Sequence, residues 1–324
     1  MAHEIDKSNN RANITYANKT PWHGLGTKRE PGDNLDIWYK EAGFDFEYKK
    51  APVKFFPDQT QGELSIPPTF NNKNVVYRSD TSAPLSIVSD RFELVQPHKI
   101  LYFFEDLIDK NEYTMEVAGC LKGGARIWAL ARAKESLNIG GVDLLLPYLL
   151  LATSVDTSMA TTAKYTMVRV VCNNTMEMCI NNNEATIKIN HDKAFDANEV
   201  KADLGLRDLT TFEDQVNAMT RRPLKNFEAK RAIIEIFGDP EAPLAEQPNE
   251  RAMKKVYELF EGKGQGSTLA TAENTAWGLV NATTEYIDHH RQARSDDNRL
   301  NSAWFGQGAS TKRKAAKVCL ELAA

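Results

Sequence analysis

Features that mark a membrane, secreted or metal-binding protein are missing from this sequence. No run of 18 or more apolar residues occurs, so no transmembrane helix is expected. The first residues, 1–7, lack the apolar stretch of a secretory signal peptide. Cysteines stand only at positions 120, 172, 179 and 319 and form no CxxC pair, which argues against a zinc site. We therefore expect a soluble protein of a reducing cytoplasm, with all four cysteines as free thiols.

Motifs of enzymatic chemistry are missing as well. The segment 262–268 has the glycines, lysine and Ser-Thr pair of a phosphate-binding loop, but not the order and spacing GxxxxGK[ST]. HExxH, GxSxG and the dinucleotide fingerprint do not occur. The sequence thus favours binding over catalysis, without nucleotide hydrolysis and without a cofactor.

Composition and pattern predict an α+β fold. The 324 residues are 42% hydrophobic and 26% charged, which suffices for a sizeable core. The pattern changes near residue 195, from strands and turns to helical spacing. We expect an N-terminal arm (1–36) on the surface, an antiparallel sheet domain with packed helices (37–195), and a helical region with a basic C-terminal tail (196–324).

The sheet domain is expected to consist mainly of hairpins. Alternation and turn residues predict a strand over Phe44–Tyr48 that could run on to Phe55, a helix over Gln96–Lys110 and a short helix over Asn174–Ile180. The expected hairpins are Asn74–Arg78 with Pro84–Val88, Tyr113–Leu121 with Arg126–Ala133 across a Lys-Gly-Gly turn, and Leu144–Thr153 with Ala160–Val171. The expected helices of the C-terminal half are Val200–Leu206, Thr211–Phe237, Asn249–Glu261, Thr271–Arg291 and Ser310–Ala323.

A basic segment with aromatic and glycine residues stands near the C-terminus. Between positions 289 and 318, seven Lys/Arg oppose two Asp, a local charge of +5 in a chain of net charge −4. Such a segment attracts a polyanion because cations displace the counterions condensed on phosphates. Solvated cations at a helix end are the alternative interpretation. The candidate nucleic-acid contacts in this segment are Trp304, Phe305, Lys312, Arg313, Lys314 and Lys317.

Two roles are open for the aromatic pair of this segment. A helix that begins at Ser310 would offer free N–H groups to a phosphate, and Trp304 and Phe305 beside it would stack on exposed bases. Alternatively, the two rings fasten the helix to the core. The Trp22-His23-Gly24 turn offers the same choice between stacking on a ligand and anchoring the arm.

The hairpin ending near position 171 is a second candidate surface. Lys164, Arg169 and Asn173 accompany several threonines, which together suit contacts to a nucleic-acid backbone. The alternative places Lys164 as a solvated residue on an edge strand.

An acidic cluster supports a different chemistry. Glu285, Asp288 and His289 are spaced i, i+3 and i+4, so on a helix they share a face that would suit Mg²⁺ in a nuclease-like enzyme. The alternative is a surface helix end in which Glu285 pairs with His289 or Arg291.

Several segments in combination resemble a known family. They are Trp22-His23-Gly24-Leu25-Gly26, Tyr77–Asp80 with Pro84-Leu85, Val88–Phe92, Val168–Thr175 and Leu300–Gly306. This set resembles a phage- and plasmid-related family catalogued as a domain of unknown function. The resemblance implies a mobile-element protein of the bacterial cytoplasm and assigns no reaction or site residue.

Three functional hypotheses follow. The first is a protein of phage or plasmid recombination or replication that binds and anneals single-stranded DNA, forms homo-oligomers and contacts no membrane. The second is a metal-dependent nuclease that uses the acidic cluster. The third is a host-interaction protein that acts against a defence system through a protein partner, which suits the overall negative charge.

Overall fold

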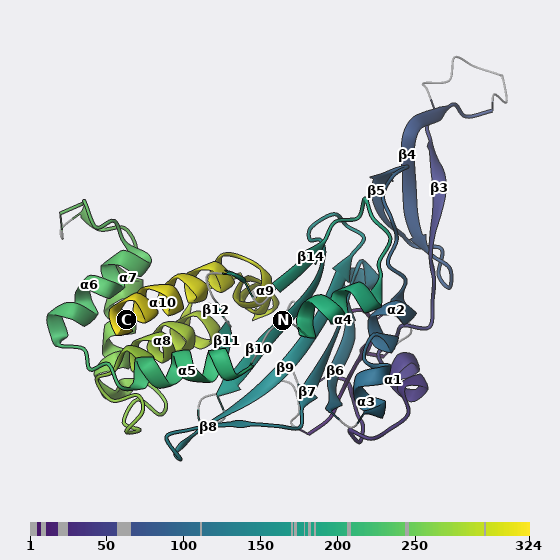
Figure 1. Ribbon diagram of the computed structural model, residues 1–324. Helices are drawn as coiled ribbons and strands as arrows, with labels where there is room; N and C mark the ends of the chain where they lie inside the picture. Colours follow the sequence, from purple (N-terminus) through teal and green to yellow (C-terminus); the bar gives the residue numbers. More distant parts are fainter. Residues whose placement is uncertain are drawn as a thin grey trace.

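A large antiparallel sheet forms the N-terminal half of the protein, and helices form the C-terminal half (Figure 1). The predicted α+β class is therefore confirmed. The computed structural model describes residues 5–324 except 8–10, 19–24, 57–65, 111, 170, 172–173, 178, 181–182, 185, 206–208, 244–245 and 295.

The large sheet contains nine strands of the described chain. Their order is β11-β10-β9-β7-β6-β1-β2, with β8 beside β9 and β14 beside β10. All neighbours run antiparallel except β1 and β2. The strands are β1 (Ile14–Tyr16), β2 (Thr27–Lys28), β6 (Tyr113–Leu121), β7 (Arg126–Ala133), β8 (Leu137–Ile139), β9 (Asp143–Ser154), β10 (Thr161–Arg169), β11 (Asn174–Glu177) and β14 (Thr186–Ile189).

A second, three-stranded sheet projects away from the large one (Figure 1). It consists of β3 (Tyr48–Lys54), β4 (Thr69–Arg78) and β5 (Pro84–Ser89), and we call it the ribbon. Two short strands, β12 (Cys179–Ile180) and β13 (Asn183–Glu184), pair with each other apart from both sheets.

All three predicted hairpins are present. They are β4–β5, β6–β7 and β9–β10. The β6–β7 turn places Lys122, Gly123 and Gly124 at φ of 53°, 66° and 93°, a backbone region that favours glycine.

Other expectations for the sheet domain were wrong. The expected surface arm supplies β1, whose Ile14 and Tyr16 are buried between β2 and β6. The first ribbon strand begins only at Tyr48, and the rings of Phe44 and Phe46 lie in the core ahead of it. The expected helix over Gln96–Lys110 is divided in two. The expected helix over Asn174–Ile180 is also wrong, because its first four residues, Asn174–Glu177, form β11 and pair with β10.

Alternate residues of the central strands divide between two faces of the large sheet. Leu149 and Leu151 of β9 join the main core, which the helices α1 (Leu35–Glu41), α2 (Pro97–Tyr102) and α4 (Ala197–Gly205) help to form. Tyr148 and Leu150 point to the opposite face, where they form a small cluster with Trp304 and Phe305 packed against it. A period of two along a strand explains this division.

The helices are short and lie mostly in the second half of the chain. They are α1 (Leu35–Glu41), α2 (Pro97–Tyr102), α3 (Glu105–Asp109), α4 (Ala197–Gly205), α5 (Leu209–Thr220), α6 (Asn226–Phe237), α7 (Glu250–Glu258), α8 (Ala276–Glu285), α9 (Asp296–Phe305) and α10 (Gln307–Ala323). The π-helical turns Leu259–Lys263 and Tyr286–His290 continue α7 and α8. None of the helices in the described chain combines the length and the apolar character needed to span a membrane.

The helical half packs directly on one end of the sheet. Its core includes the sheet residues Ile139, Leu145 and Met167. The buried carboxylate of Asp143 in β9 accepts hydrogen bonds from Trp277 Nε1 at 3.0 Å and Thr271 Oγ1 at 3.3 Å. The two halves therefore share an interior.

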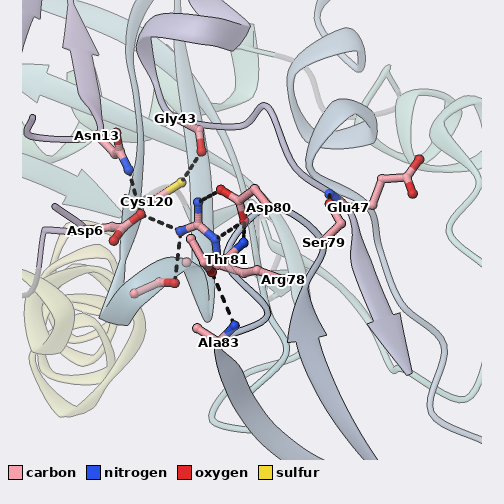
Figure 2. Close-up of polar contacts among 12 residues, drawn as sticks. Asp6, Asn13, Gly43, Glu47, Arg78, Ser79, Asp80, Thr81, Ala83 and Cys120 are labelled. Atoms are coloured by element: carbon pink, nitrogen blue, oxygen red, sulfur yellow. Dashed lines mark hydrogen bonds and ion pairs between the residues drawn. The ribbon is translucent and has the colours of Figure 1, made fainter. Parts of the chain in front are cut away.

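Arg78, at the base of the ribbon, joins three parts of the chain (Figure 2). Its guanidinium donates two hydrogen bonds to Asp80, at 2.9 and 2.7 Å, and one to Asp6 Oδ2 at 2.6 Å. It also contacts the carbonyl oxygen of Gly123 at 3.1 Å and lies 4.0 Å from the centre of the Phe46 ring. Arg78 is 1% exposed, so this charge is stable inside the protein only with these partners.

We expect Arg78→Met to lower the free energy of unfolding by about 3–5 kcal/mol, because it leaves the Asp6 carboxylate buried without its cation. Urea denaturation of purified wild type and variant measures the difference. Lys49→Met, at an exposed position of the same ribbon, is the control and should change stability by less than about 0.5 kcal/mol. Equal stability of all three proteins would contradict this role of Arg78.

We expect Asp80→Asn to cost about 1–2 kcal/mol at neutral pH, because hydrogen bonds to a charged group are lost. The hydrogen bonds from Arg78 hold the pKa of Asp80 below its ordinary value of 3.8. The carboxylate therefore stabilises the fold above that value, and the contribution is lost as the pH falls through the lower, folded-state pKa. Urea titrations of both proteins should show their difference shrinking in acid, and a difference independent of pH would contradict it.

Candidate nucleic-acid interface

A cleft lies where the strands β10 and β14 meet the helices α9 and α10. Its volume is about 240 Å³. The cleft combines cationic, hydroxyl and aromatic side chains, and its lining residues are Ser158, Met159, Ala160, Thr162, Lys164, Thr186, Lys188, Trp304, Phe305 and Arg313. The two surfaces that the sequence suggested separately, the hairpin and the basic segment, thus contribute to one cleft.

Strand register places the polar residues of the cleft on one face of the sheet. Thr162 lies opposite Lys188, and Lys164 lies opposite Thr186. Directly opposed residues of antiparallel strands share a face, so two cations and two hydroxyls point to the same side. β10 also pairs with β9 along its length and with β11 beyond Lys164. It is an interior strand, and the edge position considered for Lys164 is wrong.

The ammonium group of Lys164 connects the sheet to α9. The side chain is 2% exposed, and Nζ donates a hydrogen bond to the Trp304 carbonyl oxygen at 2.7 Å. The last carbonyls of a helix have no partner within the helix and carry partial negative charge. Lys164 satisfies one of them and so fixes the end of α9 against the cleft.

Trp304 and Phe305 are half-buried, so each residue has a part that packs against the protein and a part that is exposed. Their ring centroids are 6.4 Å apart at 48°, and both rings pack against the small cluster on the sheet. Both residues also line the cleft. The pair therefore anchors α9 and presents aromatic surface to the cleft.

The expected helix start at Ser310 is wrong. α10 begins at Gln307 after Gly306, and the Ser310 N–H already donates to the Gly306 carbonyl oxygen at 3.2 Å. Because the helix starts earlier, Ser310 lies within it and its N–H is not free. Arg313, one turn further along, lines the cleft with a half-buried side chain.

The side chain of Lys312 points into the protein, whereas that of the neighbouring Lys314 is exposed. Lys312 is 2% exposed, and its Nζ lies 2.9 Å from Oδ1 of Asp288, which is itself nearly buried. The structure therefore gives Lys312 an interior contact and not the surface position that the basic run suggested. Lys314 and Lys317 are exposed, and neither lines the cleft.

Three other candidate contacts, two residues and one turn, lie partly or wholly outside the described part of the protein. The backbone of Arg169 pairs with Leu145 and Asn174 at the end of β10, but its side chain lies outside the described part of the protein. Asn173 and the Trp22-His23-Gly24 turn also lie outside it.

The acidic cluster of the nuclease hypothesis is engaged in separate internal contacts. Glu285 is buried and accepts a hydrogen bond from the Gln265 N–H at 2.9 Å, while its other oxygen is 3.4 Å from His290 Nε2. Asp288 pairs with Lys312, and His289 is exposed. Within the described ranges, no group of three or more His, Cys, Asp or Glu is arranged to hold a metal ion.

Sequence reasoning missed Lys188, the most exposed cation of the cleft. The alternation of polar and apolar residues in Thr186-Ile187-Lys188-Ile189 was the available signal for a strand. Its place in the cleft depends on pairing with β10, which no local pattern encodes.

Comparison with known proteins identifies one similarity. A family model described as a domain of unknown function (DUF932) matches residues 84–304, more than half of the chain. The match runs from the start of β5 to Trp304 and so includes Lys164 and Lys188 but not Arg313. No curated protein and no solved structure is significantly similar to this chain.

We expect Lys312→Met to lower the free energy of unfolding by about 3–5 kcal/mol, because Asp288 would remain nearly buried without its cation. Lys314→Met is the matched control on the same helix and should change it by less than about 0.5 kcal/mol. Urea denaturation compares the two variants. If both are as stable as the wild type, the Lys312–Asp288 pair is not a significant interior contact.

Proposed function

The chain belongs to the family described as a domain of unknown function (DUF932), and since that description names no activity, we propose from its cleft that it binds single-stranded nucleic acid. The observation that carries the proposal is the convergence of cations and aromatic rings in one cleft. Lys188 and Arg313 stand on different elements and line the same space as Trp304 and Phe305.

The chemistry of the cleft suits a nucleotide with an unpaired base. Cationic side chains attract the phosphates and release their counterions, and the Thr186 hydroxyl is of the kind that donates to phosphate and sugar oxygens. The Thr162 hydroxyl already donates to the Ala160 carbonyl oxygen at 2.9 Å. Partly exposed aromatic rings stack on bases without regard to sequence, which requires that the bases are not already stacked in a duplex. A volume of about 240 Å³ is below the range of about 300–1,000 Å³ usual for small-ligand pockets, so the cleft suits one nucleotide of a longer strand.

A biological setting for this binding completes the proposal. We infer annealing of complementary strands during phage or plasmid recombination or replication, in the cytoplasm of a bacterial host, by a homo-oligomer that hydrolyses no nucleotide. The resemblance to mobile-element proteins supports the setting. The lack of a phosphate-binding loop in the sequence supports annealing without nucleotide hydrolysis.

The alternative hypotheses have less support from the described residues. A Mg²⁺-dependent nuclease needs the carboxylates of Glu285 and Asp288, and both have protein partners. A partner protein in place of nucleic acid would suit the negative net charge, but it does not explain the pairing of cations with aromatic rings in the cleft.

We expect the wild type to bind a labelled single-stranded oligonucleotide with an affinity that falls steeply with salt. Lys188→Gln with Arg313→Gln should lower the slope of log K against log salt by about 1.4, at about 0.7 for each lost phosphate contact. Fluorescence anisotropy over a salt series, with duplex and Mg²⁺ controls, measures this slope.

Lys314→Gln with Lys317→Gln is the matched control, because both lysines are exposed on α10 outside the cleft. The control should keep more of the wild-type slope than the cleft variant does. If the cleft variant and the control are indistinguishable, the cleft is not the site. If the wild type shows no salt-dependent binding, the nucleic-acid function is excluded.

A further inference from the structure

The ribbon carries cations without acidic residues between them. Its three strands contain Lys49, Lys50, Lys54, Lys73 and Arg78 and no Asp or Glu. Arg78 and Lys50 are engaged internally, Lys50 with the carbonyl oxygens of Asp90 and Phe92. Lys49, Lys54 and Lys73 are exposed, and the described part of the chain supplies no ion-pair partner to them.

Strand register places two of these lysines on the same outer face of the ribbon as an aromatic ring. Lys49 of β3 lies opposite Tyr77 of β4. Lys73 and Tyr77 have the same parity along β4 and therefore share a face. Ile87 of β5, 59% exposed, lies on that face opposite Val75. Val76 and Arg78, which have the other parity, are buried against the body of the protein.

The far end of the ribbon adds exposed aromatic rings. Phe55 is 48% exposed, Phe56 73% and Phe70 54%. Phe55 extends the pairing of β3 and β4 through a hydrogen bond from its N–H to the Pro68 carbonyl oxygen at 3.1 Å. Exposed apolar groups gathered in one place mark an interaction surface. Lysines interleaved with them indicate an anionic partner that also offers flat apolar surfaces.

We propose that the ribbon is a second nucleic-acid contact, separate from the cleft. Lys49 and Lys73 bind phosphates of a single strand, and Tyr77 with the terminal phenylalanines stacks on its bases, as aromatic residues on open sheet faces do with single strands. The inference rests on the proposed function in that both sites take the same ligand. It extends that function by letting one strand contact the protein at two places.

Charge decides between nucleic acid and a second copy of the chain on this face. A symmetric dimer through the outer face would bring the lysines of one ribbon against those of the other. Like charges brought together at an interface oppose association. A polyanion has the complementary charge.

The experiment compares three double variants by anisotropy with labelled oligothymidylate over a salt series. The ribbon variant is Lys49→Gln with Lys73→Gln, the cleft variant is Lys188→Gln with Arg313→Gln, and the control is Lys110→Gln with Lys254→Gln at exposed positions elsewhere. The ribbon variant should lose about 1.4 from the salt slope. That loss corresponds to about tenfold weaker binding near 0.15 M salt. The control should match the wild type.

A second variant separates stacking from charge. Phe56→Ser should weaken binding at least about fivefold, the loss expected for one stacked base, while the salt slope stays unchanged because no charge is removed. Thermal melts verify that each variant is folded.

The outcomes separate the two sites. If the ribbon variant binds DNA as tightly as the control while the cleft variant binds more weakly, the ribbon proposal is overturned and the proposed function stays in place. A wild type without salt-dependent binding overturns both. A ribbon variant with normal DNA binding but a changed mass in sedimentation assigns the face to a second copy and overturns the proposal.

Discussion

A cationic head group inside a protein must find oxygen partners at fixed positions, and this requirement sets how the parts of the molecule meet. Arg78, Arg126, Lys164 and Lys312 are all buried, and each lies at a junction. Arg78 joins the ribbon to the N-terminal segment, and Lys164 joins the sheet to the end of α9. Lys312 joins α10 to the turn after α8, and Arg126 joins β7 to the β9–β10 turn through Ser158 at 2.7 Å.

This requirement also explains the form of the cleft. If Lys164 pointed to solvent, α9 would lose a partner for its terminal carbonyl, and Trp304 and Phe305 would lose their fixed position beside Lys188. The buried cation thus positions the side chains around it, whereas Lys188 is exposed at the same cleft. Two lysines that line one cleft therefore have different physical roles.

Local patterns predicted those parts of the fold that local chemistry determines. The β6–β7 and β9–β10 hairpins follow from alternation and from turns rich in small or polar residues. The segment Asn174–Ile180 was assigned to a helix because a short mixed run has no clear period. Pairing with β10 makes its first residues a strand. The burial of β1 against β6 likewise depends on residues far away in the sequence.

The same limit applies to the site. Lys164, Trp304, Phe305 and Arg313 were recognised by residue type, yet only the tertiary structure brings them together. Lys312 was misplaced although its position carried a signal. The buried positions of α10 follow a helical spacing that includes it: Gly308, Ala309, Lys312, Ala315, Ala316, Val318 and Cys319. A lysine on an apolar stripe indicates a buried partner, which in this protein is Asp288.

The position of β1 in the sheet has a consequence for biosynthesis. Ile14 pairs with Gly119, and Asp6 binds Arg78, so Asp6 and β1 leave the ribosome well before these partners are made. Segments that emerge early remain unpaired until their partners have been synthesised. β1 therefore has no antiparallel neighbour to pair with until β6 has been made. A nascent chain stalled before β6 would leave the ribbon and β1 without the sheet on which they rest.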